Sequence, residues 1–251
     1  MKVIVLNFAK HRGMIIALSI LISLAIILPA TLGIVQIVYG DDLLAASADT
    51  VDYSQLIIID AGHGGEDSGA IGVDGSLEKD LNLEYALEIG RLLEEKGYAT
   101  VYTRTDDRLL YKEEENIYGI RKISDLKNRA KIAEKYPESL FLSIHMNSFG
   151  ASKYSGLQVY YSENNEASQQ IANSIQNKVK DTIQPDNNRV IKNGKDMYLL
   201  ENITNPAVLV ECGFLTNEEE CKKLSEKEYK NQLCFSIVCG IIEYMDKTNE
   251  K

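Results

Sequence analysis

Two histidines, His63 and His145, each follow a short apolar run, at 56–60 and 140–144, that is typical of a strand buried on both faces. The third histidine, His11, lies near the N-terminus, far from both in sequence. In open α/β sheets, functional sites form beyond the carboxyl ends of the strands. We therefore expect His63 and His145 to share a site, although either one alone is compatible with an ordinary hydrogen-bonded histidine.

A carboxylate beside these histidines would complete a metal site. Two neutral imidazoles and a carboxylate are a common ligand set for catalytic zinc, which keeps a fourth position for water. Glu78 is the candidate third ligand, because it lies in the first turn of a helix predicted over 76–96, with Ser76 as its cap. A glutamate there also stabilises the helix dipole, which is the structural alternative. The spacing of the three residues matches no short zinc motif, so spacing alone does not decide between these interpretations.

A fourth polar residue, Glu211, ends the apolar run 207–210. Burying an unpaired carboxylate costs several kcal/mol, so Glu211 must be paired, protonated or functional. Beside a zinc-bound water, it would act as the general base, since zinc lowers the pKa of the water towards about 7. The alternative is a structural ion pair with an arginine such as Arg104 or Arg129.

The elements that position these residues alternate between strands and helices. This order predicts an α/β fold with a mixed, largely parallel sheet and helices on both faces. The predicted strands are 56–60, 99–103, 140–144, 157–161 and 207–210. The predicted helices are 76–96, 124–136, 167–183 and 229–245. The connections 61–75 and 106–118 are long for a compact domain and are therefore candidate functional loops.

The N-terminal segment predicts export. Residues 14–39 contain no charged residue, and Lys10 and Arg12 precede them. Such a run is long enough to span a bilayer, and basic residues before it favour delivery of the following chain to the outside. A cleaved signal peptide is the alternative to an anchor. We expect residues 1–50 to be a signal peptide or transmembrane anchor with a short linker, and residues 51–251 to be an extracytoplasmic catalytic domain.

Composition excludes several classes of protein. Hydrophobic residues make up 45% and charged residues 25%, which is typical of a globular chain rather than a disordered one. The net charge of -10 argues against a nucleic-acid partner bound through a broad basic face. The four cysteines match no zinc-binding spacing, and we expect buried free thiols, with one disulfide as the alternative.

Several sequence blocks together resemble the zinc-dependent N-acetylmuramoyl-L-alanine amidases of the type-3 catalytic family. The blocks are DAGHGG (60–65) with Asp67 and Gly69-Ala70, EKD (78–80), Thr103-Arg104 with Asp107, SIHMNS (143–148) and VECGFLTN (210–217). The resemblance implies a mixed six-stranded sheet flanked by helices. It implies His63, Glu78 and His145 as the ligands of one zinc ion. It also implies Glu211 as the catalytic glutamate, and cleavage of the amide between the lactyl group of muramic acid and L-alanine of the stem peptide.

The architecture is similar to one subgroup of this family. Only 65 residues separate His145 from Glu211, which leaves no room for the regulatory helix that covers the zinc in some relatives. A single catalytic domain behind a hydrophobic segment resembles the spore-cortex, or germination-specific, amidases of endospore formers. That resemblance implies a role in the forespore envelope or cortex, in cortex modification leading to muramic lactam.

The expected partners are peptidoglycan glycan strands with stem peptides and the membrane through the N-terminal segment, with an activating protein as a further candidate. Asn147 and Arg189 are the expected contacts with glycan or peptide. Two alternatives stay open. A zinc peptidase that cuts within the stem peptide would use the same chemistry on another amide, and an inactive wall-binding scaffold would keep the fold alone.

Overall fold

The computed structural model describes residues 53–117 and 120–249. The export segment predicted over residues 1–50 lies outside these described residues. Within the two described ranges, every helix is too short or too polar to cross a membrane.

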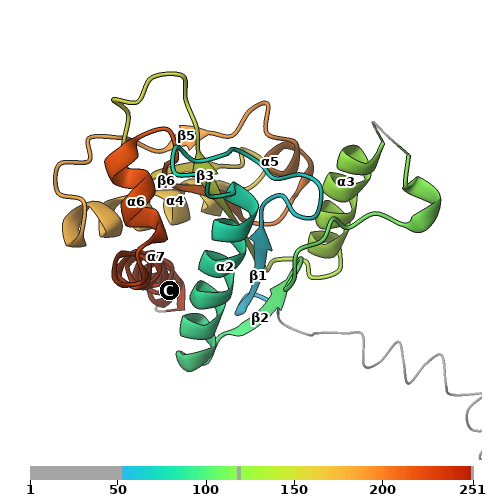
Figure 1. Cartoon of the computed structure of the whole chain (residues 1–251). Helices are drawn as coiled ribbons and strands as arrows, with labels where there is room; N and C mark the ends of the chain where they lie inside the picture. Colours follow the sequence, from blue (N-terminus) through green and yellow to red (C-terminus); the bar gives the residue numbers. More distant parts are fainter. Residues whose placement is uncertain (1–52, 118–119, 250–251) are drawn as a thin grey trace, which may run out of the picture. The chain divides into compact units, whose positions relative to one another are not determined.

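A mixed six-stranded sheet forms the centre of the fold, in the order β2-β1-β3-β6-β4-β5 (Figure 1). The strands are β1 (Leu56–Ala61), β2 (Ala99–Tyr102), β3 (Leu140–Asn147), β4 (Gln158–Tyr161), β5 (Lys192–Asn193) and β6 (Ala207–Phe214). The pairs β2–β1, β1–β3, β3–β6 and β4–β5 are parallel, and only β4 runs antiparallel to β6. The predicted α/β class and largely parallel sheet are confirmed.

Helices cover both faces of the sheet. They are α2 (Glu78–Glu95), α3 (Arg121–Glu134), α4 (Glu166–Thr182), α5 (Tyr198–Asn202), α6 (Glu218–Ser225) and α7 (Lys227–Asn249), with a short 3-10 helix, η1 (Glu113–Glu115). Apolar side chains of α2, α4 and α7 pack into one cluster with one face of the sheet. Those of α3 and α5 pack into a second cluster with the other face.

Alternation along the strands divides the core between these two clusters. Ile57 and Ile59 belong to the α2 side, whereas Ile58 belongs to the α3 side. Because side chains alternate across a strand, the α3 face continues towards the carboxyl edge through Asp60 on β1 and through Glu211 on β6. The strands β1, β3 and β6 are buried along their apolar runs, as those runs predicted, whereas the edge strands β2 and β5 are partly or fully exposed.

The start of α2 differs from its prediction. Ser76 was expected to cap the helix, but the cap position is Leu77, and no side chain caps it. Gly72 N donates a hydrogen bond to Ser76 O, and Ile71 forms a bridge with Leu77, which keeps this stretch extended. The helix therefore begins at Glu78, so Glu78 is its first residue.

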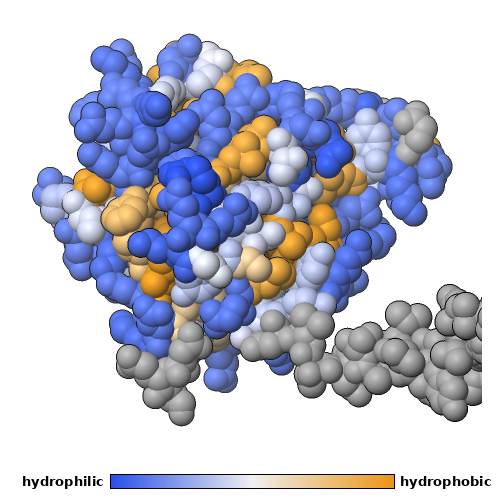
Figure 2. Space-filling view, turned by 90° about the horizontal axis from the view of Figure 1, so that it is seen from below, coloured by the Kyte–Doolittle hydropathy of each residue, from blue (hydrophilic) through white to orange (hydrophobic). Residues whose placement is uncertain are grey.

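The cysteines in the described residues are all free; Cys239 is half-buried, and Cys212, Cys221 and Cys234 are buried. Figure 2 shows one face of the molecule, on which apolar side chains form several patches between hydrophilic ones. Such a mixture is ordinary for the surface of a globular protein.

Candidate active site

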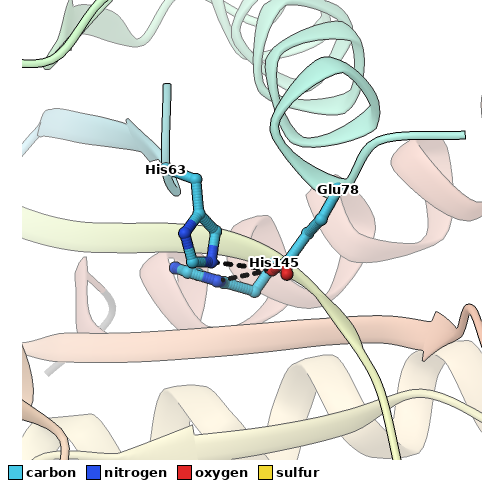
Figure 3. Close-up of side chains that lie close together, drawn as sticks. All are labelled: His63, Glu78 and His145. Atoms are coloured by element: carbon cyan, nitrogen blue, oxygen red, sulfur yellow. Dashed lines mark hydrogen bonds and ion pairs between the residues drawn. The ribbon is translucent and has the colours of Figure 1, made fainter. Parts of the chain in front are cut away.

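Three of the predicted residues lie together at the carboxyl edge of the sheet (Figure 3). Glu78 Oε1 lies 3.2 Å from His63 Nε2 and 2.9 Å from His145 Nδ1. One possible ligand atom from each residue lies within 4.8 Å of the others. This cluster, His63–Glu78–His145, has the size and the donor types of a site for one metal ion.

The turn after β1 aims His63 at the cluster. His63 has a φ of 61°, a left-handed conformation that is uncommon outside glycine and concentrates at functional sites. Its Nδ1 lies 2.9 Å from Asp67 Oδ2, so its Nε2 is left facing Glu78. Burial by itself lowers the pKa of His63, but the hydrogen bonds with Asp67 and Glu78 raise that pKa to about 9. The two neighbouring carboxylates therefore favour a positive charge at this imidazole.

Glu78 is fixed by main-chain donors as well as by the two histidines. Its side chain is buried, with Oε2 accepting a hydrogen bond from Ala70 N at 2.8 Å and Oε1 accepting one from Met146 N at 3.3 Å. Within the described residues, no lysine or arginine forms an ion pair with it. A buried carboxylate that contacts two histidines and, within the described residues, no lysine or arginine fits a metal ligand, because a bound cation would neutralise it.

Glu211 lies beside this cluster. It pairs in register with His145 across the parallel strands β3 and β6, so the two side chains share one face of the sheet. Its Oε2 is buried and has no hydrogen-bond partner within the described part of the chain. Burial raises the pKa of Glu211 to about 7, and the charge of Glu78 adds to that rise. Glu211 as a whole is half-buried, but a buried carboxylate oxygen without a partner is unusual and is typical of a functional site.

The alternative ion pair for Glu211 is wrong, because both arginines contact other groups. Arg129 forms ion pairs with Asp60 at 2.7 Å and with Asp125 at 2.8 Å. Arg104 donates hydrogen bonds to four main-chain carbonyl groups, those of Ala61, Gly62, Lys79 and Asp106.

The two arginines instead hold the turn that carries His63. Arg129 Nη1 donates to Ala61 O at 2.7 Å, and its Nη2 donates to His63 O at 2.7 Å. Arg104 Nη2 donates to Gly62 O at 2.9 Å. The three carbonyl groups of residues 61–63 are thus fixed by two buried guanidinium groups. The sequence interpretation missed this role, although Arg104 lies in one of the blocks that carry the family resemblance.

Replacing Asp60 with asparagine is expected to lower the free energy of unfolding by about 3 kcal/mol at neutral pH, because Arg129 would lose a buried charged partner. Burial by itself raises the pKa of Asp60, but Arg129 and the hydroxyl groups of Ser143 and Thr103 lower it below its ordinary value of 3.8. The stability that Asp60 contributes is therefore present above pH 3.8 and is lost as the pH falls through the lower folded-state pKa.

Urea unfolding of the parent chain and of Asp60→Asn, measured from pH 7 to pH 3, checks this expectation. The difference in the free energy of unfolding between the parent chain and Asp60→Asn should become smaller as the pH falls. Asp106→Asn is the matched control, since Asp106 is 60% exposed and forms only a surface ion pair with Arg108. Equal stability of Asp60→Asn and the parent chain at pH 7 would contradict the structural role of Asp60.

Asn147 and Arg189, the two predicted substrate contacts, lie in the lining of one pocket of about 300 Å³. Asn147 ends β3 two residues beyond His145, and Arg189 lies in the connection before β5. The structure therefore brings them together although 41 residues separate them in sequence.

The fold and the cluster define an α/β protein with a candidate three-ligand metal site and, beside it, a glutamate with one buried carboxylate oxygen at the edge of the sheet. Residues 57–243 match the family described as N-acetylmuramoyl-L-alanine amidase. The chain therefore belongs to the N-acetylmuramoyl-L-alanine amidase family, and the predictions of family and of amidase activity are confirmed.

Individual relatives agree with this membership. The germination-specific N-acetylmuramoyl-L-alanine amidase of Bacillus subtilis is 34% identical over 78% of this chain and 82% of its own length. The CwlD amidase of Clostridioides difficile, solved in complex with the GerS lipoprotein, is 41% identical with a TM-score of 0.73, over 76% of this chain and 98% of that one. AmiC2 of Nostoc punctiforme is 33% identical with a TM-score of 0.66, over 77% and 98%.

Proposed function

We propose that this chain hydrolyses the amide between the lactyl group of N-acetylmuramic acid and the L-alanine of the stem peptide, with Glu211 as the catalytic residue. The observation that carries this assignment is the buried, unpartnered Oε2 of Glu211 beside the His63–Glu78–His145 cluster. A fold does not need such an atom, whereas a reaction that moves a proton to and from water does.

The cluster would hold one zinc ion through His63, Glu78 and His145. Two imidazoles and a carboxylate are a set that zinc accepts while a position stays open for substrate or water. When bound, zinc polarises the amide carbonyl and lowers the pKa of water. Asp67 supports the site because its hydrogen bond orients His63, as outer partners of metal-binding histidines do.

Glu211 would then move one proton in two steps. Its free Oε2 accepts a proton from the attacking water as the oxygen approaches the lactyl carbonyl carbon. The same carboxyl group next donates that proton to the alanine nitrogen as the carbon–nitrogen bond breaks. The products are a lactyl carboxylate on the glycan and a stem peptide with a free amino group.

Two defined substrates separate this function from its alternatives. The full-length chain with zinc is incubated with an N-acetylmuramoyl peptide and, separately, with the same peptide without the muramoyl group. The amidase should cleave only the first substrate and release the intact peptide. A zinc peptidase would cleave both peptides internally, and an inactive scaffold would cleave neither.

We also propose that the chain acts outside the cytoplasm, in the spore cortex, with residues 1–50 as its export segment or membrane anchor and residues 51–251 as the catalytic domain. Similarity to the germination-specific amidase of Bacillus subtilis supports the cortex role. The complex of the CwlD amidase with the GerS lipoprotein supports an activating protein partner. Full activity of the zinc-saturated chain on peptidoglycan, without any added protein, would contradict the need for that partner.

Replacing Gly62 with alanine is expected to weaken zinc binding about 10- to 100-fold, a loss typical of disturbed support around a metal ligand. A Cβ atom at Gly62 would lie 2.2 Å from His145 Nε2, so the imidazole would have to move. Competition against a zinc-binding dye measures the affinity, and circular dichroism checks the fold. The control is Gly150→Ala, where a Cβ atom meets nothing within 4 Å. Unchanged zinc affinity of Gly62→Ala would contradict His145 as a ligand.

A further inference from the structure

The pocket of about 300 Å³ that contains Asn147 and Arg189 continues the edge on which the candidate metal site lies. Gln158, on β4, lines this pocket and pairs in register with Glu211. Phe214, at the end of β6, also lines it and pairs with Asn147. A group bound in the pocket would therefore be a close neighbour of an amide held beside Glu211.

Arg189 is held in a fixed position in this pocket. Its Nε donates a hydrogen bond to Ser155 O at 2.7 Å, and its Nη1 donates one to Gln158 Oε1 at 3.3 Å. The guanidinium carbon lies 4.4 Å from the centre of the Phe214 ring and 5.8 Å from that of Tyr154. Contacts with aromatic faces orient a guanidinium group while leaving its positive charge uncompensated.

Arg189 forms no ion pair within the described residues, where its Nη2 also donates no hydrogen bond. Burial raises the pKa of Glu220 and the charge of Arg189 opposes that rise, but the two carboxylate oxygens of Glu220 accept hydrogen bonds from Gly156 N and Phe214 N rather than from Arg189. Lys192 lines the same pocket and likewise forms no ion pair among those residues. Two unpaired cations at one pocket contrast with the net charge of -10 for the whole chain. The pocket is therefore suited to an anion, and a guanidinium group with a free edge suits the planar carboxylate best.

Tyr160 interacts electrostatically with both Arg189 and Glu211. It lines the pocket on β4, two residues after Gln158 and on the same face. Burial raises the pKa of Tyr160, the charge of Glu211 raises it further, and Arg189 lowers it. The charges of both Arg189 and Glu211 therefore act on its hydroxyl group.

We propose that Arg189, assisted by Lys192, binds a free carboxylate of the stem peptide close to the scissile amide, so that this enzyme selects peptides that carry that charge. The inference rests on the proposed amidase function. In the substrate, the lactyl carboxyl group is consumed in the amide and the N-acetylated sugars are neutral. The carboxylates of the attached peptide are then the anionic groups nearest to the scissile bond.

The test uses two N-acetylmuramoyl peptides that differ in one group only. The second residue of the peptide carries either a free carboxylate or the corresponding amide. Zinc-loaded full-length chain should cleave the carboxylate substrate with a kcat/KM about 10- to 100-fold higher, the value of one charge-assisted hydrogen-bonded contact. Arg189→Gln should remove this preference by raising KM for the carboxylate substrate, and should leave the amidated substrate nearly unaffected.

Two further variants separate charge recognition from loop structure. Arg189→Lys keeps the positive charge without the planar edge and should retain part of the preference. Arg91→Gln is the matched control, because Arg91 lies on the exposed surface of α2 and pairs with Glu88 and Glu95. A purely structural role of Arg189 would lower kcat/KM for both substrates equally, and that result would overturn the proposal, as would an undiminished preference in Arg189→Gln.

A binding measurement keeps this inference separate from the proposed function. Glu211→Gln chain, which cannot turn over substrate under the proposed mechanism, is titrated with the two free stem peptides and followed by NMR. Tighter binding of the carboxylate peptide by Glu211→Gln, lost in the double variant that also carries Arg189→Gln, supports carboxylate binding by Arg189. This result holds even if the wild-type chain cleaves neither substrate. Equal binding of both peptides, or loss of affinity for peptide-free glycan strands in Arg189→Gln, would overturn it.

Discussion

Replacing Glu211 with glutamine is expected to lower the rate of amide hydrolysis about 10²- to 10⁴-fold, the usual contribution of a general acid–base group. Glutamine has nearly the same shape but neither accepts nor returns the proton. Zinc affinity should stay within a few-fold, because His63, Glu78 and His145 are unchanged. The stability of the chain should not fall, since the variant removes a buried carboxylate whose Oε2 has no partner in the described residues.

Three measurements on one preparation check this combination: the rate on an N-acetylmuramoyl peptide, the bound zinc per chain and the unfolding midpoint in urea. A matched control is Glu84→Gln, because Glu84 is largely exposed on α2 and contacts Lys230. Activity close to that of the parent chain in Glu211→Gln would remove Glu211 from the mechanism. A large loss of stability in that variant would instead assign Glu211 a structural role.

Replacing His145 with alanine is expected to lower both zinc affinity and activity by more than about 100-fold, because losing a ligand should exceed the loss of an outer hydrogen bond to one. Asp67→Asn supplies that milder case, since Asp67 is not one of the proposed ligands but orients His63 through Nδ1, besides contacting Gly69 N and Lys122. It should weaken zinc binding about 10- to 100-fold, with activity restored by excess zinc. Excess zinc should not restore His145→Ala.

Dialysis against a zinc buffer, followed by metal analysis, measures these affinities. His11→Ala is the matched histidine control, because His11 precedes the predicted catalytic domain. If His145→Ala binds zinc as tightly as His11→Ala does, the proposed ligand set is wrong. Together with Glu211→Gln, this series separates residues that hold the metal from the residue that moves the proton.

Local patterns predicted the elements that carry the site. The apolar runs before His63 and His145 identified two buried strands, and a parallel sheet necessarily brings the carboxyl ends of adjacent strands to one edge. Glu78 followed from its place at the start of a helix, although Ser76 was wrongly expected to cap it. The residues with the most chemistry were thus also those that sequence periodicity places most directly.

Features that depend on long-range contacts could not be predicted in this way. Arg129 binds carbonyl groups more than 60 residues away, so its sequence position did not show whether it would pair with Glu211 or hold the His63 turn. Strand β5 has two residues, which are too few to show the alternation of apolar and polar residues that identifies a strand. The unpaired state of Arg189 is a property of the folded pocket, in which Ser155, Gln158 and Phe214 surround it.

The most direct test of the proposed reaction is hydrolysis of an N-acetylmuramoyl peptide in H2(18)O by the zinc-loaded full-length chain, with mass spectrometry of both products. We predict one heavy oxygen in the lactyl carboxylate of the sugar product and none in the released peptide, whose first residue is L-alanine with a free amino group. A heavy oxygen in a peptide carboxyl group, with alanine still attached to the sugar, would show that another amide is cleaved and would contradict the proposed function.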